Sequence, residues 1–149
     1  YIGNRKVTGI LIENDLCGAY LCRSVIGIGL NVNQTDFDPS LPNPTSLAQE
    51  SGHPFDRADI FIRFYQHLAN RYRMLTQEET SDNHTSQIDT DYLNRLYRLN
   101  KEHSFVDGRT GEHFIGTITG IRPGGDLEVR IATTGQLRTF LFKEIEYVI

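Results

Sequence analysis

A lysine and three glycines are the residues whose types and spacing could carry out chemistry. Lys6 opens the apolar stretch KVTGILIE, Gly9 follows three residues later, and Gly27 and Gly29 alternate in VIGIGLNVN. Side chains of a strand alternate between its two faces, so Gly27 and Gly29 lie on one face. If the two strands pair, the glycines form a shallow floor without side chains, where a flat ligand can lie with Lys6 as a fixed positive charge at its edge.

Each of these residues also has a less specific explanation. Strand glycines often mark bulges or close packing, and a single lysine is usually a solvated surface charge. The segment from Gly27 matches only part of the G-x-G-x-x-G nucleotide fingerprint, because Val32 takes the third glycine position and no helix follows. A site is favoured because the lysine, the glycines and the polar end Asn31–Asn33 fall on neighbouring strands.

The hydrophobic pattern predicts the elements that must position these residues. Residues 5–13 and 19–33 predict two strands, which can pair as a hairpin joined around residues 14–18. After a loop that contains three prolines, Thr45–Ser46 predicts the start of a short helix, which Gly52 ends.

A longer helix follows, with Asp56 as its predicted cap. It carries an apolar stripe at helical spacing, which we interpret as core: Ile60, Phe61, Phe64, Leu68, Tyr72 and Leu75. Residues 77–90 predict a polar, mobile loop, and residues 92–99 predict a short last helix.

The segment from Ser104 to Ile149 has a different pattern, with five short strands separated by evenly spaced turn signals. This pattern predicts a small closed β-barrel of the SH3 kind, because closure removes exposed strand edges. We therefore expect an α+β protein with two domains, residues 1–101 and residues 102–149. The first is predicted as a mixed sheet with helices, and the second as the barrel.

Composition excludes several classes of partner. The 149 residues have a net charge of −4 and contain no basic run, so we expect no nucleic-acid partner. No apolar run approaches the roughly 18 residues that cross a bilayer, so we expect no membrane partner and a cytoplasmic location.

A single C-x4-C pair is a poor zinc signature, and we interpret Cys17 and Cys22 as reduced thiols. Because the chain starts at Tyr1 and its only methionine is Met74, we expect a fragment of a longer protein.

Three motifs together resemble a known family. K-x-x-G-I-L-I-E, then V-I-G-I-G-L-N-V-N, then P-T-S-L are similar in order and spacing to the C-terminal part of the catalytic domain of biotin–protein ligases, which is class II synthetase-like. G-T-I-T-G-I, G-x-L-x-V and F-x-x-x-E-I are similar to that family's C-terminal SH3-like domain. The resemblance covers the whole chain. It implies ATP-dependent formation of biotinyl-5′-AMP with Mg²⁺, and transfer of biotin to a lysine of a biotin carboxyl carrier domain of a biotin-dependent carboxylase.

The resemblance also implies roles for individual residues. Lys6 matches the catalytic lysine, which contacts the biotin carboxylate and stabilises charge on the transferring oxygens. Gly9 and Leu11 match positions against the biotin bicycle, and Gly27–Gly29, which includes Ile28, matches the opposing strand. Asn31 matches an asparagine near the ATP phosphates and the metal. No metal ligand is predicted in this chain, and Thr45–Ser46 is interpreted as structural.

The sequence also departs from the family. It contains no glycine- and arginine-rich adenylate loop, no tryptophan-containing strand end and no DNA-binding helix-turn-helix. We therefore expect the isolated 149 residues to be inactive in biotin ligation. Two alternatives stay open: a relative of lipoate–protein ligases, and a non-enzymatic SH3-like interaction module. Pairing into a homodimer is also left open.

Overall fold

The computed structural model describes residues 1–78, 87–141 and 143–148. The chain divides into two compact units, Tyr1–His67 and Leu68–Val148. The helix α2 (Arg57–Glu78) contains the division. The domain boundary between residues 101 and 102 stays a prediction.

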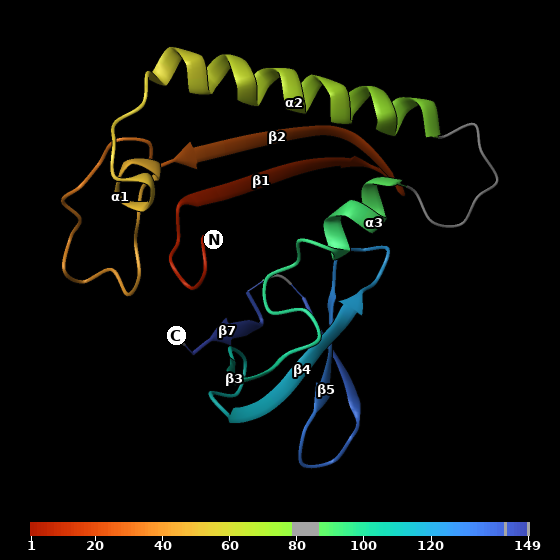
Figure 1. The fold of residues 1–149 in the computed structure, drawn as a ribbon. Helices are drawn as coiled ribbons and strands as arrows, with labels where there is room; N and C mark the ends of the chain where they lie inside the picture. Colours follow the sequence, from red (N-terminus) through yellow and green to blue (C-terminus); the bar gives the residue numbers. More distant parts are fainter. Residues whose placement is uncertain (79–86, 142, 149) are drawn as a thin grey trace. The chain divides into compact units, whose positions relative to one another are not determined.

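A long antiparallel hairpin forms the sheet of the first unit (Figure 1). The strand β1 (Thr8–Cys17) pairs with β2 (Tyr20–Leu30), so the predicted hairpin is confirmed. The turn is shorter than predicted, because Asn14 and Asp15 belong to β1. Gly18 turns the chain with a φ of 65°.

The interpretation of the two cysteines as reduced thiols is wrong for this structure, because Cys17 and Cys22 form a disulfide. The prediction rested on the usual redox state of cytosolic proteins, and it took no account of the pairing of the strands. Antiparallel pairing brings the end of β1 against the start of β2, and the two Cα atoms are 5.8 Å apart.

Two helices follow as predicted. The short helix α1 (Leu47–Ser51) begins after Ser46, whose hydroxyl accepts a hydrogen bond from the Gln49 amide, and ends at Gly52, which has a φ of 78°. The carboxylate of Asp56 accepts a hydrogen bond from the Ala58 amide at 2.7 Å and caps α2.

The apolar stripe of α2 is exposed, so its interpretation as core is wrong for the described chain. Phe61, Phe64, Leu68, Tyr72 and Leu75 are between 38% and 66% exposed. The spacing that predicted an amphipathic helix identifies an apolar face correctly. It does not identify how closely another surface packs against that face, and these five side chains remain exposed in the described residues.

The last helix lies earlier in the chain than predicted. The helix α3 (Gln87–Leu93) occupies the end of the predicted loop 77–90, residues 77 and 78 belong to α2, and residues 79–86 lie outside the described residues. Leu96 and Leu99, which were assigned to the helix, instead pack against the core of the second unit.

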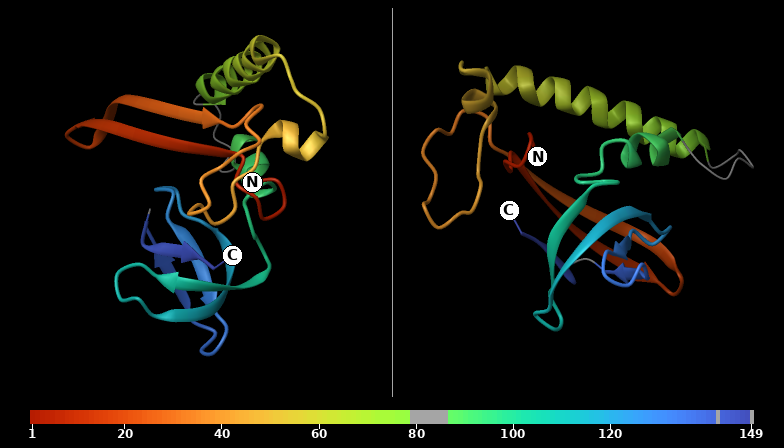
Figure 2. Two further views of the ribbon diagram at one scale, coloured as in Figure 1. Left: turned by 90° about the vertical axis from the view of Figure 1, so that its left-hand side faces the viewer. Right: turned by 60° about the horizontal axis from the view of Figure 1, so that its bottom comes forward.

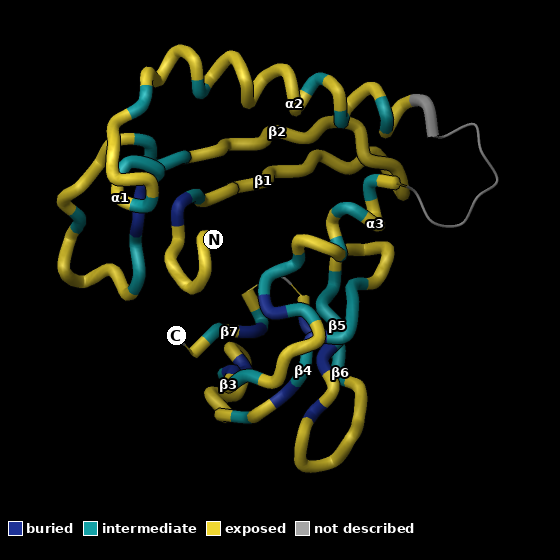
Figure 3. The backbone as a smooth tube through the Cα atoms, in the orientation of Figure 1, coloured by how far each residue is buried: buried dark blue, intermediate teal, exposed yellow. Residues whose placement is uncertain are grey.

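Five antiparallel strands form the sheet of the second unit, as expected (Figure 2). They are β3 (Glu102–Asp107), β4 (His113–Ile121), β5 (Leu127–Ile131), β6 (Leu137–Phe140) and β7 (Ile145–Tyr147). Their order is β6-β5-β4-β3-β7. Their buried side chains form the core cluster: Phe105, Ile118, Val129, Phe140 and Ile145. Figure 3 shows these buried segments along the strands, whereas the hairpin β1–β2 is exposed along nearly its whole length.

The predicted closure into a barrel is not confirmed. Within the described residues, β6 and β7 remain the two edges of the sheet, and no ladder joins them. The strand β7 has only three residues, which pair with β3. None of the described helices is both long enough and apolar enough to cross a membrane.

Candidate functional site

The three glycines lie together on one face of the hairpin. Gly9 pairs directly with Gly29, and Leu11 pairs with Gly27. Residues opposite each other in an antiparallel pair share a face, as do residues two apart on one strand. The glycine floor, defined as Gly9, Gly27 and Gly29, is therefore a patch of bare backbone beside the exposed side chain of Leu11.

Nothing in the described chain requires glycine at these positions. None of the three has a positive φ. A Cβ atom at Gly9 meets no atom within 4 Å, at Gly29 only the carbonyl oxygen of Gly9 at 4.0 Å, and at Gly27 only atoms of Leu11 at 3.9 Å or more. The explanations by bulge or internal packing therefore fail here, and the floor is open to something outside the described residues.

Lys6 lies two residues before β1 begins and three residues before Gly9. Its backbone is held on both sides, because its amide donates to the Asn43 carbonyl at 2.7 Å and its carbonyl accepts from the Thr45 amide at 3.0 Å. These bonds pair Lys6 with Pro44 in a short parallel bridge. The residue is exposed, while its neighbour Val7 is buried. The chain thus fixes the backbone of Lys6 and leaves its side chain accessible.

Asn31 connects the end of β2 to the same loop. Its side-chain amide donates to the Thr45 carbonyl at 2.9 Å, and its backbone amide donates to the Val7 carbonyl at 2.9 Å. The predicted position near ATP phosphates is not tested by these contacts. They give Asn31 a structural role in holding β1, β2 and the Thr45 segment together.

Thr45 connects Lys6 to the start of α1, which its sequence position alone does not predict. It is fully buried, and its hydroxyl donates to a Glu50 carboxylate oxygen at 2.5 Å. The other Glu50 oxygen pairs with Arg5 at 2.7 Å. P-T-S-L predicts a helix start, but in the structure the backbone amide of Thr45 also donates to the Lys6 carbonyl. A polar residue directly before the cap was the available signal.

Ile28 lies apart from the floor. Residues that alternate along β2 point to opposite faces, so Ile28 and its partner Ile10 occupy the other face of the hairpin. There they line a groove of about 430 Å³. Its other lining residues are Thr8, Leu30, Val32, Arg57, Ile60, Phe61 and Phe64. The structure thus brings Gly9, Leu11, Gly27 and Gly29 together and separates the Ile28 side chain from them.

A magnesium ion is not supported by the chain's own donors. Within residues 1–78, 87–141 and 143–148, no three His, Cys, Asp or Glu side chains are grouped closely enough to hold a metal ion. The site residues described above offer a lysine, an asparagine and bare backbone, whereas Mg²⁺ is held through carboxylates. The described residues thus form no all-protein cage for Mg²⁺, which in nucleotide sites is held largely by the phosphates of the substrate.

Comparison with known proteins places this geometry in context. No family model matches the chain. The bifunctional ligase/repressor BirA of Bacillus spizizenii (strain ATCC 23059 / NRRL B-14472 / W23) is 39% identical over 75 residues, and BirA of Bacillus subtilis (strain 168) is 37% identical over 75 residues. The matched stretch is 48% of this chain and only 23% of each relative.

Solved structures match over a longer span. The apo structure of biotin protein ligase from Aquifex aeolicus matches 99% of this chain and 61% of its own, with a TM-score of 0.70 and 17% identity. The same ligase in complex with biotin and ATP matches 99% of this chain and 59% of its own, with a TM-score of 0.69 and 20% identity. At this identity the structures show a shared fold. Together with the BirA matches, they confirm the predicted resemblance: the chain is similar to the C-terminal region of biotin protein ligases.

Proposed function

We propose that the chain forms part of a biotin protein ligase, which activates biotin with ATP and transfers it to a lysine of a biotin carboxyl carrier domain. The glycine floor is the observation that carries the proposal. Its bare backbone is explained by no neighbour within the described residues, and a flat bicyclic ligand fits such a surface. The Aquifex structure solved with biotin and ATP supports the choice of ligands.

In this proposal, biotin lies on the floor with its ring against Gly9, Gly27, Gly29 and Leu11. Its carboxylate points toward Lys6. The backbone of Lys6 is fixed by Asn43 and Thr45, so its flexible side chain extends from a defined point of the chain. A compact cation beside a carboxylate stabilises negative charge that develops on the transferring oxygens.

The reaction has two balanced steps. A carboxylate oxygen of biotin attacks the α-phosphorus of ATP, a new P–O bond forms, and the bond to pyrophosphate breaks. The neutral amine of the carrier lysine then attacks the biotinyl carbonyl carbon, AMP leaves, and the nitrogen loses a proton to give an amide. Lys6 stabilises oxygen charge in both steps and forms no covalent bond itself.

We further propose that the 149 residues alone do not complete the reaction, since they match only 59–61% of the Aquifex ligase. The test incubates the isolated chain with biotin, ATP and a carrier domain, and follows biotinylation by streptavidin blot. No product above background is expected, whereas clear biotinylation would contradict the proposal.

The SH3-like assignment of residues 102–149 is also kept as a proposal. Five short antiparallel strands connected in sequence around the core cluster support it. A barrel requires a ladder between β6 and β7 in solution. Cross-strand NMR contacts between Leu137–Phe140 and Ile145–Tyr147 are expected in a barrel, and their absence from a folded sample would rule it out.

The decisive experiment changes Lys6 in the complete gene product. Lys6→Ala is expected to lower the rate of biotinyl-AMP formation roughly 100- to 1,000-fold, the usual loss for one stabilising group at a developing charge. The backbone bonds of Lys6 do not involve its side chain, so the thermal midpoint should stay unchanged. Arg5→Ala is the matched control, because it removes a neighbouring cation that is already paired with Glu50. Full activity of Lys6→Ala would refute the proposed role.

A further inference from the structure

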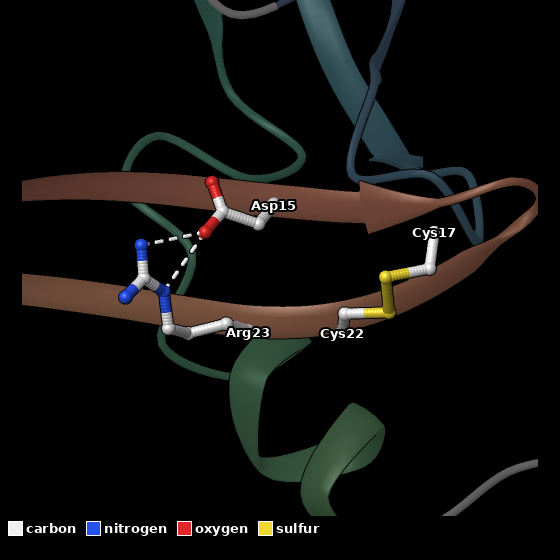
Figure 4. Close-up of a disulfide and its surroundings, with 4 residues drawn as sticks. All are labelled: Asp15, Cys17, Cys22 and Arg23. Carbon is white, nitrogen blue, oxygen red and sulfur yellow. Dashed lines mark hydrogen bonds and ion pairs between the residues drawn. A yellow bond between two sulfur atoms is a disulfide. The ribbon is translucent and has the colours of Figure 1, made fainter.

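We propose that the disulfide between Cys17 and Cys22 is a reversible redox clip on the tip of the β1–β2 hairpin. Figure 4 shows the bond at the tip, next to the ion pair between Asp15 and Arg23. Both cysteines are exposed, so a reducing thiol can reach either sulfur. Exposed disulfides are typically labile and regulatory, whereas structural ones resist reduction.

The disulfide holds an irregular register. Asp15 pairs with Arg23, but the next residue, Leu16, pairs with Leu21. Cys22 is therefore the extra residue of a β-bulge and has no partner opposite it. The bond from Cys17 to Cys22 ties this extra residue to the other strand and thereby fixes the bulge.

The rest of the hairpin does not depend on the bond. Just inside the bulge, Arg23 pairs with Asp15 at 2.7 Å, and the Ser24 hydroxyl donates to the Asn14 side chain at 2.7 Å. The ladder then continues to the pair of Thr8 and Leu30. A disulfide across five residues closes a very short loop and removes little chain entropy from the unfolded state. Reduction is therefore expected to loosen the tip alone.

The tip also presents apolar side chains. Leu16, Tyr20 and Leu21 are 69%, 79% and 61% exposed. With the disulfide formed, Leu16 and Leu21 are held opposite each other beside the bulge. With it broken, the bulge is free to move, and the three side chains lose their common arrangement. The redox state thus controls the shape of an exposed apolar tip.

The exchange is a two-electron reaction with a dithiol protein of the thioredoxin class. A thiolate of the reductant attacks one sulfur, the Cys17–Cys22 bond breaks, and a mixed disulfide forms. The second thiol of the reductant resolves this intermediate. The two cysteines gain two electrons and two protons, and the reductant becomes a disulfide.

The test equilibrates the native chain in glutathione buffers from fully reduced to fully oxidised, traps thiols by alkylation and counts them by mass spectrometry. Two thiols are expected to appear together within the buffer range. Hydrogen exchange of residues 15–23 should rise at least tenfold on reduction, while residues 8–12 and 26–30 keep their protection.

The variant that replaces both cysteines by serine is the control for the loosened state. It should show the fast exchange of the reduced tip in every buffer, with the same protection elsewhere. A disulfide that stays intact in fully reducing glutathione at native pH, or exchange at the tip that does not change on reduction, would overturn the proposal.

Discussion

At the scale of single residues, glycine has two different reasons to occur in the strands of this protein. Gly116 in β4 is required by packing, because a Cβ atom there would lie 2.8 Å from a Val129 methyl carbon and 3.1 Å from the Arg130 carbonyl oxygen. Gly29 in β2 has no such neighbour. The same residue type thus marks internal packing in one sheet and an open face in the other.

This contrast gives a prediction for Gly29→Ala. The added methyl group has room in the free chain, so the thermal midpoint should stay the same or rise slightly. A ligand lying on the floor would meet that methyl group at a cost of roughly 1–3 kcal/mol. Titration calorimetry on the complete gene product should therefore show biotin binding weakened about tenfold or more.

Gly116→Ala serves as the matched control for that experiment. It should lower the thermal midpoint of the second unit, because either Val129 or the backbone of β5 must move. Unchanged biotin affinity in Gly29→Ala would show that no ligand contacts the floor at this position.

A buried carboxylate makes the second unit sensitive to acid. Asp107 is fully buried and accepts hydrogen bonds from the Arg109 amide at 2.9 Å and from the guanidinium of Arg138. The Arg109 amide is the largest cause that holds the pKa of Asp107 below its usual value, with help from the Arg109 and Arg138 side chains and against the opposing effect of burial.

The sign of the pH dependence follows from this lowered pKa. The ionised form stabilises the fold above the unfolded carboxyl pKa of about 3.9, and this stabilisation is lost as the pH falls through the lower folded pKa. Unfolding by urea, followed by tyrosine fluorescence, should therefore show stability falling below about pH 4. Asp107→Asn should flatten this fall, even if the variant is less stable at neutral pH. An equally steep fall in the variant would assign the acid sensitivity to other groups.

At the scale of elements, the helix α1 depends on its cap. The Ser46 hydroxyl accepts from the Gln49 amide at 3.2 Å, and the helix has only five residues over which to spread the loss of that bond. Ser46→Ala should destabilise the helix by about 1 kcal/mol, seen as faster hydrogen exchange of the Gln49 amide. Ser46→Gly should cost only a few tenths of that amount, because glycine is an acceptable cap. Equal effects of the two variants would show that capping is not the cause.

Patterns that are local in sequence predicted the elements well. Period two placed Gly27 and Gly29 on one face, and the Ser46 and Gly52 signals marked both ends of α1 correctly. Two of the predictions that failed required knowledge of a partner surface. The disulfide of Cys17 depends on where the hairpin turns, and the exposure of Phe61 depends on what lies against α2.

At the scale of the whole molecule, the five buried residues of the core cluster all belong to the second unit. Phe105 is fully buried there and has ring contacts to Phe114 and Tyr147. Phe105→Ala should cost about 3–5 kcal/mol, a large part of the stability of a small unit. Hydrogen exchange should show lost protection in residues 102–147 and unchanged protection in the hairpin of residues 8–30. Simultaneous loss in both segments would show that the chain unfolds as one cooperative unit.

The sequence predicted the strand content of the second unit but not the closure of its sheet. Turn residues separate the strands visibly, whereas pairing between β6 and β7 depends on their lengths and on long-range geometry. The resemblance to biotin protein ligases was predictable because three separated motifs agree in order. The part played by Thr45 was not, since it depends on contacts between segments far apart in the chain.

The two backbone hydrogen bonds that hold Lys6 can form only late in the synthesis of the chain on the ribosome. Both partners, Asn43 and Thr45, come about forty residues later in the chain, so a long loop must close before the lysine is held in place. At 5–20 residues per second, Lys6 is made roughly 2–8 seconds before those partners exist. During that interval the backbone of Lys6 has neither of these hydrogen bonds, so the positive charge of the lysine is not yet held in place.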